Sequence, residues 1–282
     1  MIVVKLQGGL GNQLFQLAFG VAQSQRERCS FVLAEGFGYS EMLASFFDLQ
    51  NIKILKKISK KYSLENQLEE NQWIAPAKNL ANFENQSNVL YDGYFQSEDY
   101  FLEHKNLIIN NLKINKKYRI DARRWLGICD GRPCVAFHVR QEDYFSFGND
   151  ELGGKNLTLP FDYYVNCWDT ICKIFPNGFH AIWVAEKPLK DFQTSFFRFK
   201  KIENVTYHFV CYPQFVMDFQ TLMQADIIVT ANSTFSWWAA YLSKDKPIFA
   251  PENWLGFKIN QEFPSKIIPT YWHKISTLPQ HF

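Results

Sequence analysis

Residues 138–144 (HVRQEDY) form a polar cluster directly after the apolar residues CVAF. Ligands of open parallel sheets bind beyond the carboxyl ends of the strands, so these side chains could reach one. The planar guanidinium of Arg140 can hold two oxygens of a diphosphate and stabilise the charge that a leaving diphosphate gains. The alternative is a solvated arginine paired with Glu142 or Asp143, and the spacing alone does not decide between the two.

A second polar cluster, residues 230–234 (TANST), stands between a predicted strand and a helix that starts near Phe235. Ser233 and Thr234 are good helix caps, which explains them without a ligand. The same geometry also suits phosphate, because a helix N-terminus offers free backbone N–H groups and the positive end of the helix dipole. Both interpretations can hold at once, with one hydroxyl on the helix and another on phosphate.

The third cluster is the loop 8–12 (GGLGN), whose glycines allow a close approach of the backbone to a ligand. It is not a P-loop, since no Gly-Lys-Ser/Thr follows, and Leu14 breaks the dinucleotide-binding fingerprint. The sequence contains no Asp-x-Asp, which transferases that hold a nucleotide diphosphate through a metal commonly use. We therefore expect neutralisation by an arginine and a helix end, with no metal and no cofactor.

The hydrophobic pattern predicts strands alternating with helices. Strands are expected at 1–6, 31–33, 134–139, 180–185, 207–211, 227–230 and, last, 247–250, and helices at 13–28, 160–175, 215–223 and 235–242. The alternation over 133–250 predicts a parallel sheet covered on both faces. The N-terminal unit has the same pattern, and the stretch 50–125 is charged and less periodic. Two doubly wound α/β domains facing each other across a cleft account for this order, with a boundary near residue 128.

Composition excludes some classes of protein. The 282 residues are 47% hydrophobic and 17% aromatic, enough for a packed core, which is the favoured place for most of the rings. The net charge of +2 gives no strong field toward nucleic acid. Six scattered cysteines match no common zinc spacing and are expected to be reduced, buried thiols. With no signal peptide and no run of roughly 18 apolar residues, the sequence predicts a cytoplasmic protein.

The basic segment 53–61 (KILKKISKK) has two interpretations. Ile54, Leu55, Ile58 and Tyr62 could share one helix face, with lysines on the other. A solvated surface helix is the favoured interpretation. The alternative is a helix that lies peripherally on the inner face of an anionic membrane, which would suit a lipid-linked glycan acceptor.

Four segments together resemble the α-1,2-fucosyltransferase family, in the family's order: GGLGNQLFQLAFG (8–20), GYFQSEDYF (93–101), HVRQEDY (138–144) and ANSTFSWWAAYL (231–242). A weaker likeness is APENW (250–254). The resemblance implies a GT-B-like fold with two Rossmann-like domains, 1–128 on the acceptor side and 129–282 binding the GDP-sugar. It also implies transfer of L-fucose from GDP-β-L-fucose to the 2-hydroxyl of a galactose in an oligosaccharide, with inversion and without a metal.

Roles carry over position by position. Arg140 matches the motif arginine that contacts the diphosphate. Asp218, 15 residues before Ser233, matches an aspartate that recognises guanine; a carboxylate can accept from the ring N–H and the amino group together. The alternative for Asp218 is an ordinary surface position. The full set of donor-binding residues that the resemblance implies is Gly9, Gly11, Asn12, His138, Arg140, Asp218, Asn232, Ser233 and Thr234.

The sequence departs from the family motifs at three places, one of which, Ala239 and Tyr241 for the usual Gly and Trp, is interpreted as structural. Gln141 replaces the second motif arginine, and residues 185–187 (AEK) replace the usual Ser-Asp-Asp. A general base should deprotonate the acceptor hydroxyl. Asp143 is the first candidate and Glu142 the second, although Asp143 could equally orient Arg140.

Three other functions compete with that of a fucosyltransferase. A transferase of the same fold with another nucleotide-sugar or acceptor stays open because of the departures at Gln141 and 185–187. A catalytically inactive glycan-binding protein would not need Arg140, Asn232, Ser233 and Thr234. An NAD-dependent oxidoreductase is disfavoured by the broken glycine fingerprint.

Overall fold

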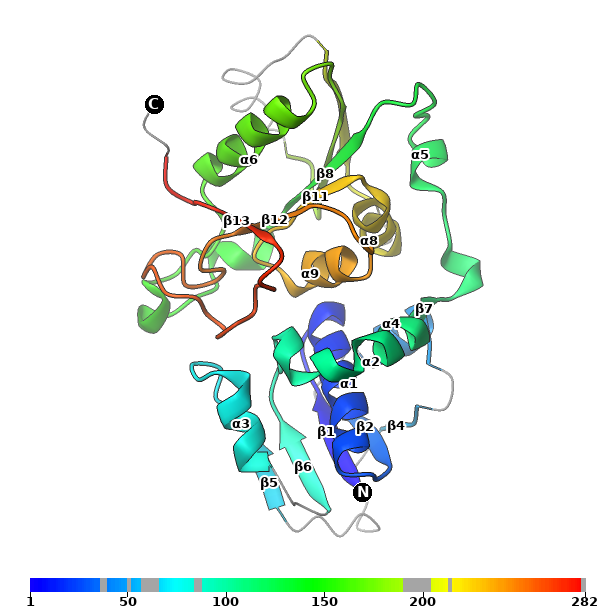
Figure 1. Ribbon diagram of the computed structural model, residues 1–282, viewed down its shortest axis with the longest axis vertical. Coiled ribbons are helices and arrows are strands. Elements are labelled where there is room, and N and C mark those ends of the chain that lie inside the picture. Colours follow the sequence, from blue (N-terminus) through cyan, green and yellow to red (C-terminus); the bar gives the residue numbers. More distant parts are fainter. Residues whose placement is uncertain are drawn as a thin grey trace. The chain divides into compact units, whose positions relative to one another are not determined.

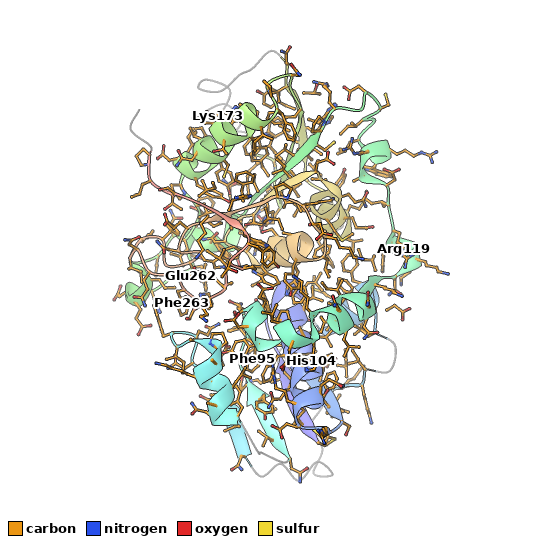
Figure 2. All side chains as sticks on the ribbon, in the orientation of Figure 1. Phe95, His104, Arg119, Lys173, Glu262 and Phe263 are labelled. Atoms are coloured by element: carbon orange, nitrogen blue, oxygen red, sulfur yellow. The ribbon has the colours of Figure 1, made fainter. Side chains whose placement is uncertain are left out.

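The computed structural model describes residues 1–35, 40–49, 52–56, 66–83, 88–189, 204–212 and 215–279. The chain forms two compact units. Unit 1 is Met1–Tyr118 with Phe263–Pro269, and unit 2 is Arg119–Glu262 with Thr270–Phe282. Arg119 marks the first place where the chain passes between the units, and Glu262 and Phe263 mark the second (Figure 2). The first passage, between Tyr118 and Arg119, lies earlier in the chain than the domain boundary expected near residue 128.

The sheet of unit 1 has five parallel strands in the order β4-β2-β1-β6-β5 (Figure 1). The strands are β1 (Ile2–Leu6), β2 (Phe31–Glu35), β4 (Ile54–Leu55), β5 (Asn66–Glu69) and β6 (Val89–Asp92). The central strand β1 is rich in β-branched residues, which suits a strand buried on both faces. β3 (Phe47–Asp48) and β7 (Lys113–Ile114) form a separate antiparallel pair.

Helix α1 (Leu10–Arg26) covers one face of this sheet. Gly20 lets it approach closely, because a Cβ there would lie 2.9 Å from the ring of Phe31 and 3.3 Å from Val4. On the same helix, Phe19 stacks on Phe95 with ring centroids 3.8 Å apart. The other helices of the unit are α2 (Ser40–Phe46), α3 (Pro76–Phe83) and α4 (Lys105–Asn111).

Two predictions for unit 1 are corrected. The helix expected at 13–28 already begins at Leu10, with Gly9 as its N-cap, so Gly11 and Asn12 belong to its first turn and not to a loop. Ile54–Leu55, expected on a helix, form strand β4 because they pair with Leu33 and Ala34 of β2. Residues 57–61 of the basic segment lie outside the described residues, and membrane contact through this segment stays a prediction.

The sheet of unit 2 has six parallel strands in the order β10-β9-β8-β11-β12-β13. They are β8 (Cys134–Val139), β9 (His180–Ala185), β10 (Thr206–Val210), β11 (Ile227–Val229), β12 (Ile248–Pro251) and β13 (His273–Ile275). Counted within the unit the order is 3-2-1-4-5-6, that of the doubly wound dinucleotide-binding sheet. β13 corrects the expectation that the strand at 247–250 is the last.

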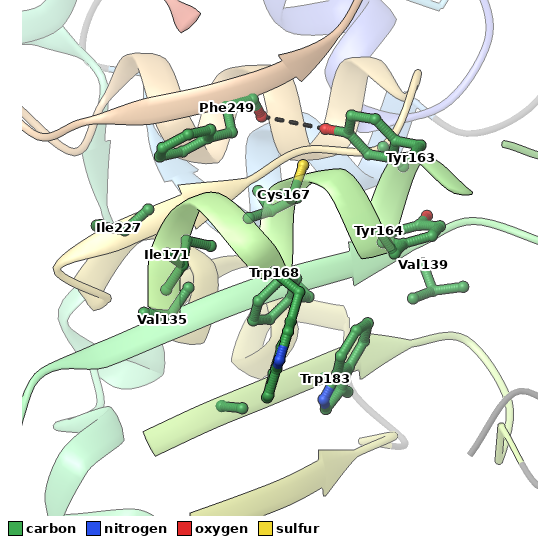
Figure 3. Close-up of a cluster of buried hydrophobic side chains, with 14 of the residues drawn as sticks. Val135, Val139, Tyr163, Tyr164, Cys167, Trp168, Ile171, Trp183, Ile227 and Phe249 are labelled. Carbon is green, nitrogen blue, oxygen red and sulfur yellow. Dashed lines mark hydrogen bonds between the residues drawn. The ribbon is translucent and has the colours of Figure 1, made fainter. Parts of the chain in front are cut away.

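Helices cover both faces of this sheet. α6 (Phe161–Ile174) packs on one face, where Trp168 and Trp183 form the centre of a buried cluster (Figure 3). α8 (Phe215–Gln224) and α9 (Thr234–Tyr241) lie on the other (Figure 1). The short α5 (Ala122–Trp125) belongs to unit 2 because the backbone N–H of Ile120 and of Ala122 donate to two glutamines of α8, at 3.0 and 2.9 Å.

The prediction of an α/β fold with parallel sheets of GT-B-like type is confirmed. All six cysteines are free thiols, but Cys129 and Cys211 are exposed, whereas buried thiols were expected. Among the described helices, none has the length and apolar character needed to span a membrane.

Candidate functional site

The carboxyl edge of the unit 2 sheet has one switch point, between β8 and β11. The chain leaves β8 toward β9 on one side and leaves β11 toward β12 on the other, so the two loops diverge there. Phe137 pairs with Val229, which places Arg140 and Asn232 at matching positions, three residues beyond this pair on each strand. Such a divergence of loops is where doubly wound sheets bind ligands. Two of the polar clusters predicted from sequence therefore meet at this edge.

Arg140 is held by two carboxylates at this edge. Its Nη1 donates to Glu186, which follows β9, and its Nη2 donates to Asp143 Oδ1 at 2.8 Å. The guanidinium carbon also lies 5.3 Å from the centroid of the Tyr144 ring. Burial raises the pKa of Glu186, although the charge of Arg140 opposes the shift. The predicted pairing of Arg140 with Asp143 is thus present, and Glu186 is a partner that sequence analysis did not assign.

Three tyrosine hydroxyls fasten the strand ends at the switch point. Tyr144 donates to the carbonyl oxygen of Asn232 at 2.9 Å, which joins the loop after β8 to the loop after β11. From α6, Tyr164 donates to the carbonyl of His138 at 3.0 Å, and Tyr163 donates to the carbonyl of Thr230 at 2.7 Å. Hydrogen bonds to buried carbonyls avoid the cost of unsatisfied backbone groups, so these tyrosines fix the backbone from which the site is built.

His138 lies at the end of β8 and is buried, with its ring 5.8 Å from that of Phe235 on α9. Burial, with a contribution from the positive charge of Arg140, lowers the pKa of His138 to about 3, so the imidazole is neutral. Its Nδ1 has no hydrogen-bond partner within the described chain. A buried, unpartnered ring nitrogen next to Arg140 is a polar group that a ligand could satisfy.

The turn before α9 presents the N-terminus of that helix at the same edge. Ser233 is the N-cap residue with an extended backbone, yet its side chain makes no capping hydrogen bond, contrary to the simplest expectation for a serine there. Thr234 begins the helix. The Asn232 amide donates to the carbonyl of Leu157 at 2.8 Å, which fixes the turn from the opposite side. The first N–H groups of α9 are the donors that a phosphate would use.

Asp218, on the first turns of α8, is buried rather than on an ordinary surface. Burial raises its pKa to about 7, against a hydrogen bond from the backbone of Tyr212 that lowers it. Its Oδ1 has no hydrogen-bond partner within the described residues. A buried carboxylate without a cation as its partner is costly, so the position favours a ligand that supplies N–H donors.

The carboxyl edge of unit 1 also has a switch point, between β1 and β6, and two sequence motifs meet there. Gln16 of α1 is buried and joins them: its Oε1 accepts from the N–H of Gln7, and its Nε2 donates to the carbonyl of Gly93, both at 3.0 Å. Asn12 Oδ1 accepts from Gln96 at 2.8 Å. The glycine segment and the segment after β6 are thus parts of one edge.

Two further features shape this edge. Gly9 is exposed, and a Cβ there would meet nothing within 4 Å, so the backbone at this position is open to a ligand. The carboxylate of Glu70, directly after β5, accepts from the N–H groups of Tyr94 and Phe95, which follow β6, both at 2.7 Å. Gly93 is required beside it, because a Cβ would lie 2.5 Å from Glu70 Cβ.

The residues predicted from sequence therefore fall into two groups. The structure brings together His138, Arg140, Asp143, Asn232, Ser233 and Thr234 at the unit 2 edge, with Asp218 on the neighbouring helix α8, while Gly9, Gly11 and Asn12 belong to unit 1. Three residues at these edges, Glu186, Tyr144 and Gln16, were not among the predicted site residues. The position of Glu186, directly after an apolar strand, was the available signal, since the same pattern had identified Arg140.

Comparisons with known proteins agree with this fold. Residues 199–272 match the model of glycosyl transferase family 11. An α-1,2-colitosyltransferase from Escherichia coli is 26% identical over 271 residues, which cover 86% of this chain and 87% of that protein. The O-antigen biosynthesis glycosyltransferase WbnK from Escherichia coli is 23% identical over 299 residues, covering 88% and 93%.

Among solved structures, Arabidopsis thaliana FUT1 in complex with GDP is similar with a TM-score of 0.54 and 11% identity, covering 88% of this chain and 69% of that one. At this identity the likeness concerns the fold alone. The family model and the two relatives carry the assignment of function class. The chain is a glycosyltransferase, and its resemblance to the fucosyltransferases of glycosyl transferase family 11 is confirmed.

Proposed function

We propose that this glycosyltransferase moves L-fucose from GDP-β-L-fucose to the 2-hydroxyl of a galactose residue in an oligosaccharide, with inversion and without a metal. The observation that carries the proposal is the meeting of Arg140 with the N-terminus of α9 at the switch point of unit 2. A fixed cation and the N–H groups of a helix N-terminus on neighbouring strand ends suit a diphosphate. The GDP in the similar plant structure supports a guanine nucleotide as the donor.

In the proposed reaction, the acceptor hydroxyl attacks the anomeric carbon on the side opposite GDP. The new C–O bond forms as the bond to the β-phosphate oxygen breaks, and the electron pair leaves with GDP. Arg140, Ser233, Thr234 and the first N–H groups of α9 would stabilise the charge that develops on the diphosphate. These donors act most strongly if they are already in place, and the hydroxyls of Tyr144 and Tyr163 hold the backbone that carries them.

The base that takes the acceptor proton is a separate question. Asp143 was predicted first and Glu142 second, and neither role has been tested. Asp143 forms an ion pair with Arg140, which supports its other predicted role, to orient that arginine. Glu142 pairs with Lys187 at 2.8 Å. Asp218 would bind guanine through its buried carboxylate, and Gly9, Gly11 and Asn12 would face the donor from unit 1.

A second donor is favoured by one observation. One E. coli relative is named as a colitosyltransferase, and Gln141 and Glu186 stand where the fucosyltransferase motifs differ. Colitose linked to GDP is therefore the alternative donor to fucose. The nucleotide part of the site would serve both, because its charges contact the diphosphate and the base rather than the sugar.

The test is GDP release from GDP-fucose and GDP-colitose across a panel of galactose-terminated acceptors, with EDTA present throughout. We expect acceptor-dependent release with one of the two donors, and methylation analysis of the product should give a 1,2 linkage. Release that EDTA abolishes and a divalent cation restores would contradict metal independence. No acceptor-dependent release from any GDP-sugar would contradict the proposed function.

A further inference from the structure

The two carboxylates that hold Arg140 differ in their surroundings. The Glu186 side chain is 23% exposed, and its second oxygen also accepts from the backbone N–H of Gln141 at 3.4 Å. The Asp143 side chain is 63% exposed and contacts the guanidinium through Oδ1 at 2.8 Å. One partner of Arg140 is therefore built into the protein, and the other lies on the solvent side of the guanidinium.

The difference in exposure between Glu186 and Asp143 matters because both neutralise the charge of Arg140. Gln141 stands where the resembling family has a second arginine, so Arg140 is the one arginine of the motif segment. Its charge is already offset by Glu186 and Asp143. A diphosphate that arrives at Arg140 meets two carboxylates, and like charges in contact oppose each other. Binding is favourable only if one carboxylate gives up the guanidinium.

The exposed carboxylate is the one that can leave. Asp143 regains full hydration in water, and exposed ion pairs contribute little to stability. Glu186 would be left as a partly buried charge without a partner, which is costly. Asp143 also sits on a short 3-10 turn, Glu142–Phe145, whereas Glu186 directly follows strand β9. Exchange is therefore expected on the Nη2 side of Arg140.

We propose that Asp143 is an exchangeable counter-ion that occupies the diphosphate position on Arg140 when the donor is absent, and that Glu186 is the positioning residue that keeps the guanidinium in place during the exchange. This rests on the proposed GDP-sugar donor. On binding, the hydrogen bond from Nη2 to Asp143 Oδ1 is replaced by one from Nη2 to a phosphate oxygen. The hydrogen bond from Nη1 to Glu186 is kept.

The two carboxylates should then respond in opposite ways to loss of charge. Asp143→Asn weakens the competitor for Arg140, so GDP should bind about two- to fivefold more tightly. Glu186→Gln loosens the guanidinium, so GDP should bind more weakly and kcat should fall about tenfold or more. A general base at position 143 would give a different pattern, a fall in kcat of about 10²-fold or more with GDP affinity unchanged.

The experiment measures GDP affinity by titration calorimetry, and kcat and KM for the donor, in wild type, Asp143→Asn, Glu186→Gln and Arg140→Ala. Asp150→Asn is the matched control, because it removes the same charge from an exposed side chain further along the segment between β8 and α6. We expect this control to keep wild-type affinity. The double variant Arg140→Ala/Asp143→Asn should bind GDP no more tightly than Arg140→Ala alone, because no guanidinium is left to compete for.

Each outcome has a meaning. The proposal is overturned if Asp143→Asn leaves GDP affinity unchanged, if it tightens binding equally in the Arg140→Ala background, or if Glu186→Gln tightens binding as Asp143→Asn does. If Glu186→Gln does not fold by circular dichroism, Glu186→Asp, which keeps the charge and shortens the side chain, takes its place. Wild-type protein that binds no GDP at millimolar concentration would instead overturn the proposed function itself.

Discussion

The carboxyl edges of the two sheets share one construction and differ in chemistry. In each unit a central strand, β1 or β8, ends beside a second strand, β6 or β11, and sequence motifs follow both. The edge of unit 1 carries the amides of Gln7, Asn12, Gln16 and Gln96, with the carboxylates of Asp92 and Glu70 hydrogen-bonded beside them. The edge of unit 2 carries Arg140, Glu186, Asp143 and, on α8, Asp218. Parallel strands create the place for a site, and a few residues after each strand decide what it can bind.

The two edges are also fastened differently. In unit 1 a single buried amide, Gln16, satisfies one backbone N–H and one carbonyl. In unit 2 the carbonyls at the strand ends accept from three separate hydroxyls, those of Tyr144, Tyr163 and Tyr164. An amide can donate and accept at once, so its loss leaves two backbone groups without partners. The difference predicts that loss of Gln16 destabilises unit 1 more than loss of any one of these hydroxyls destabilises unit 2.

The largest expected effect comes from the charge on unit 2. Arg140→Ala should lower kcat by about 10²–10³-fold, because a fixed donor to the leaving diphosphate is lost. Arg140→Lys keeps the charge but loses the planar fork and should recover only part of the rate. Steady-state GDP release measures both, with circular dichroism to show that the variants fold. Wild-type turnover in Arg140→Ala would show that the arginine at the unit 2 edge does not set the chemistry of the two edges apart.

Gln16→Leu should have the next largest effect, and on stability rather than on charge. Leucine fills the space but leaves the N–H of Gln7 and the carbonyl of Gly93 without their partner, at a cost of about 1–3 kcal/mol. Urea unfolding measures the loss. Gln67→Leu, on the exposed strand β5 of the same unit, is the control and should change stability by less than about 0.5 kcal/mol. Equal effects of the two variants would show that Gln16 does not fasten this edge.

GDP binding should depend on pH through Asp218, which belongs to the edge of unit 2. The pKa of Asp218 is raised to about 7, first by burial, and the proposed contact with guanine needs the carboxylate. The carboxylate forms as pH rises through the pKa, so affinity for GDP should increase by roughly tenfold between pH 6 and pH 8. Asp218→Asn should flatten this profile apart from the slope caused by ionisation of the phosphate. Identical profiles for wild type and variant would exclude Asp218 from binding.

The smallest expected effect is that of Tyr144→Phe, which removes one hydroxyl from the unit 2 edge. Loss of its bond to the carbonyl of Asn232 should cost about 0.5–1.5 kcal/mol in urea unfolding. Tyr163→Phe should cost more, because that hydroxyl reaches two carbonyls, of Thr230 at 2.7 Å and of Phe249 at 3.3 Å. If Tyr144→Phe lowered the free energy of unfolding as much as Gln16→Leu, the strand ends of unit 2 would not be held jointly by three hydroxyls.

Much of unit 2 could be predicted because its strands are short apolar runs with polar residues at their ends. β8 and β9 were predicted to the residue, and Pro160 marks the start of α6 as expected. The pairing of Arg140 with Asp143 was one of the interpretations that the spacing along the chain left open. Local patterns were sufficient wherever an element carried its own hydrophobic signal.

The remaining features depend on contacts between distant parts of the sequence. The hydrogen bond between Gln16 and Gly93 joins residues 77 positions apart, and the local sequence of neither segment predicts it. Glu186 becomes a partner of Arg140 only because β9 lies beside β8 in the sheet. Ile54 and Leu55 were expected on a helix because they could share one helix face with Ile58 and Tyr62, but pairing with β2 overrides that local preference.

Unit 1 is not one continuous stretch of sequence. Its return segment, Phe263–Pro269, packs Phe263 on Trp73 with ring centroids 4.2 Å apart, and Ser265 N–H donates to the carbonyl of Gln72 at 2.9 Å. The Ser97 hydroxyl donates to the carbonyl of Lys266 at 2.7 Å. A gene fragment that stopped after codon 118 would therefore express an incomplete domain with an uncovered tryptophan. Anyone wishing to produce this half by itself would need to fuse the seven-residue strip back on through a linker.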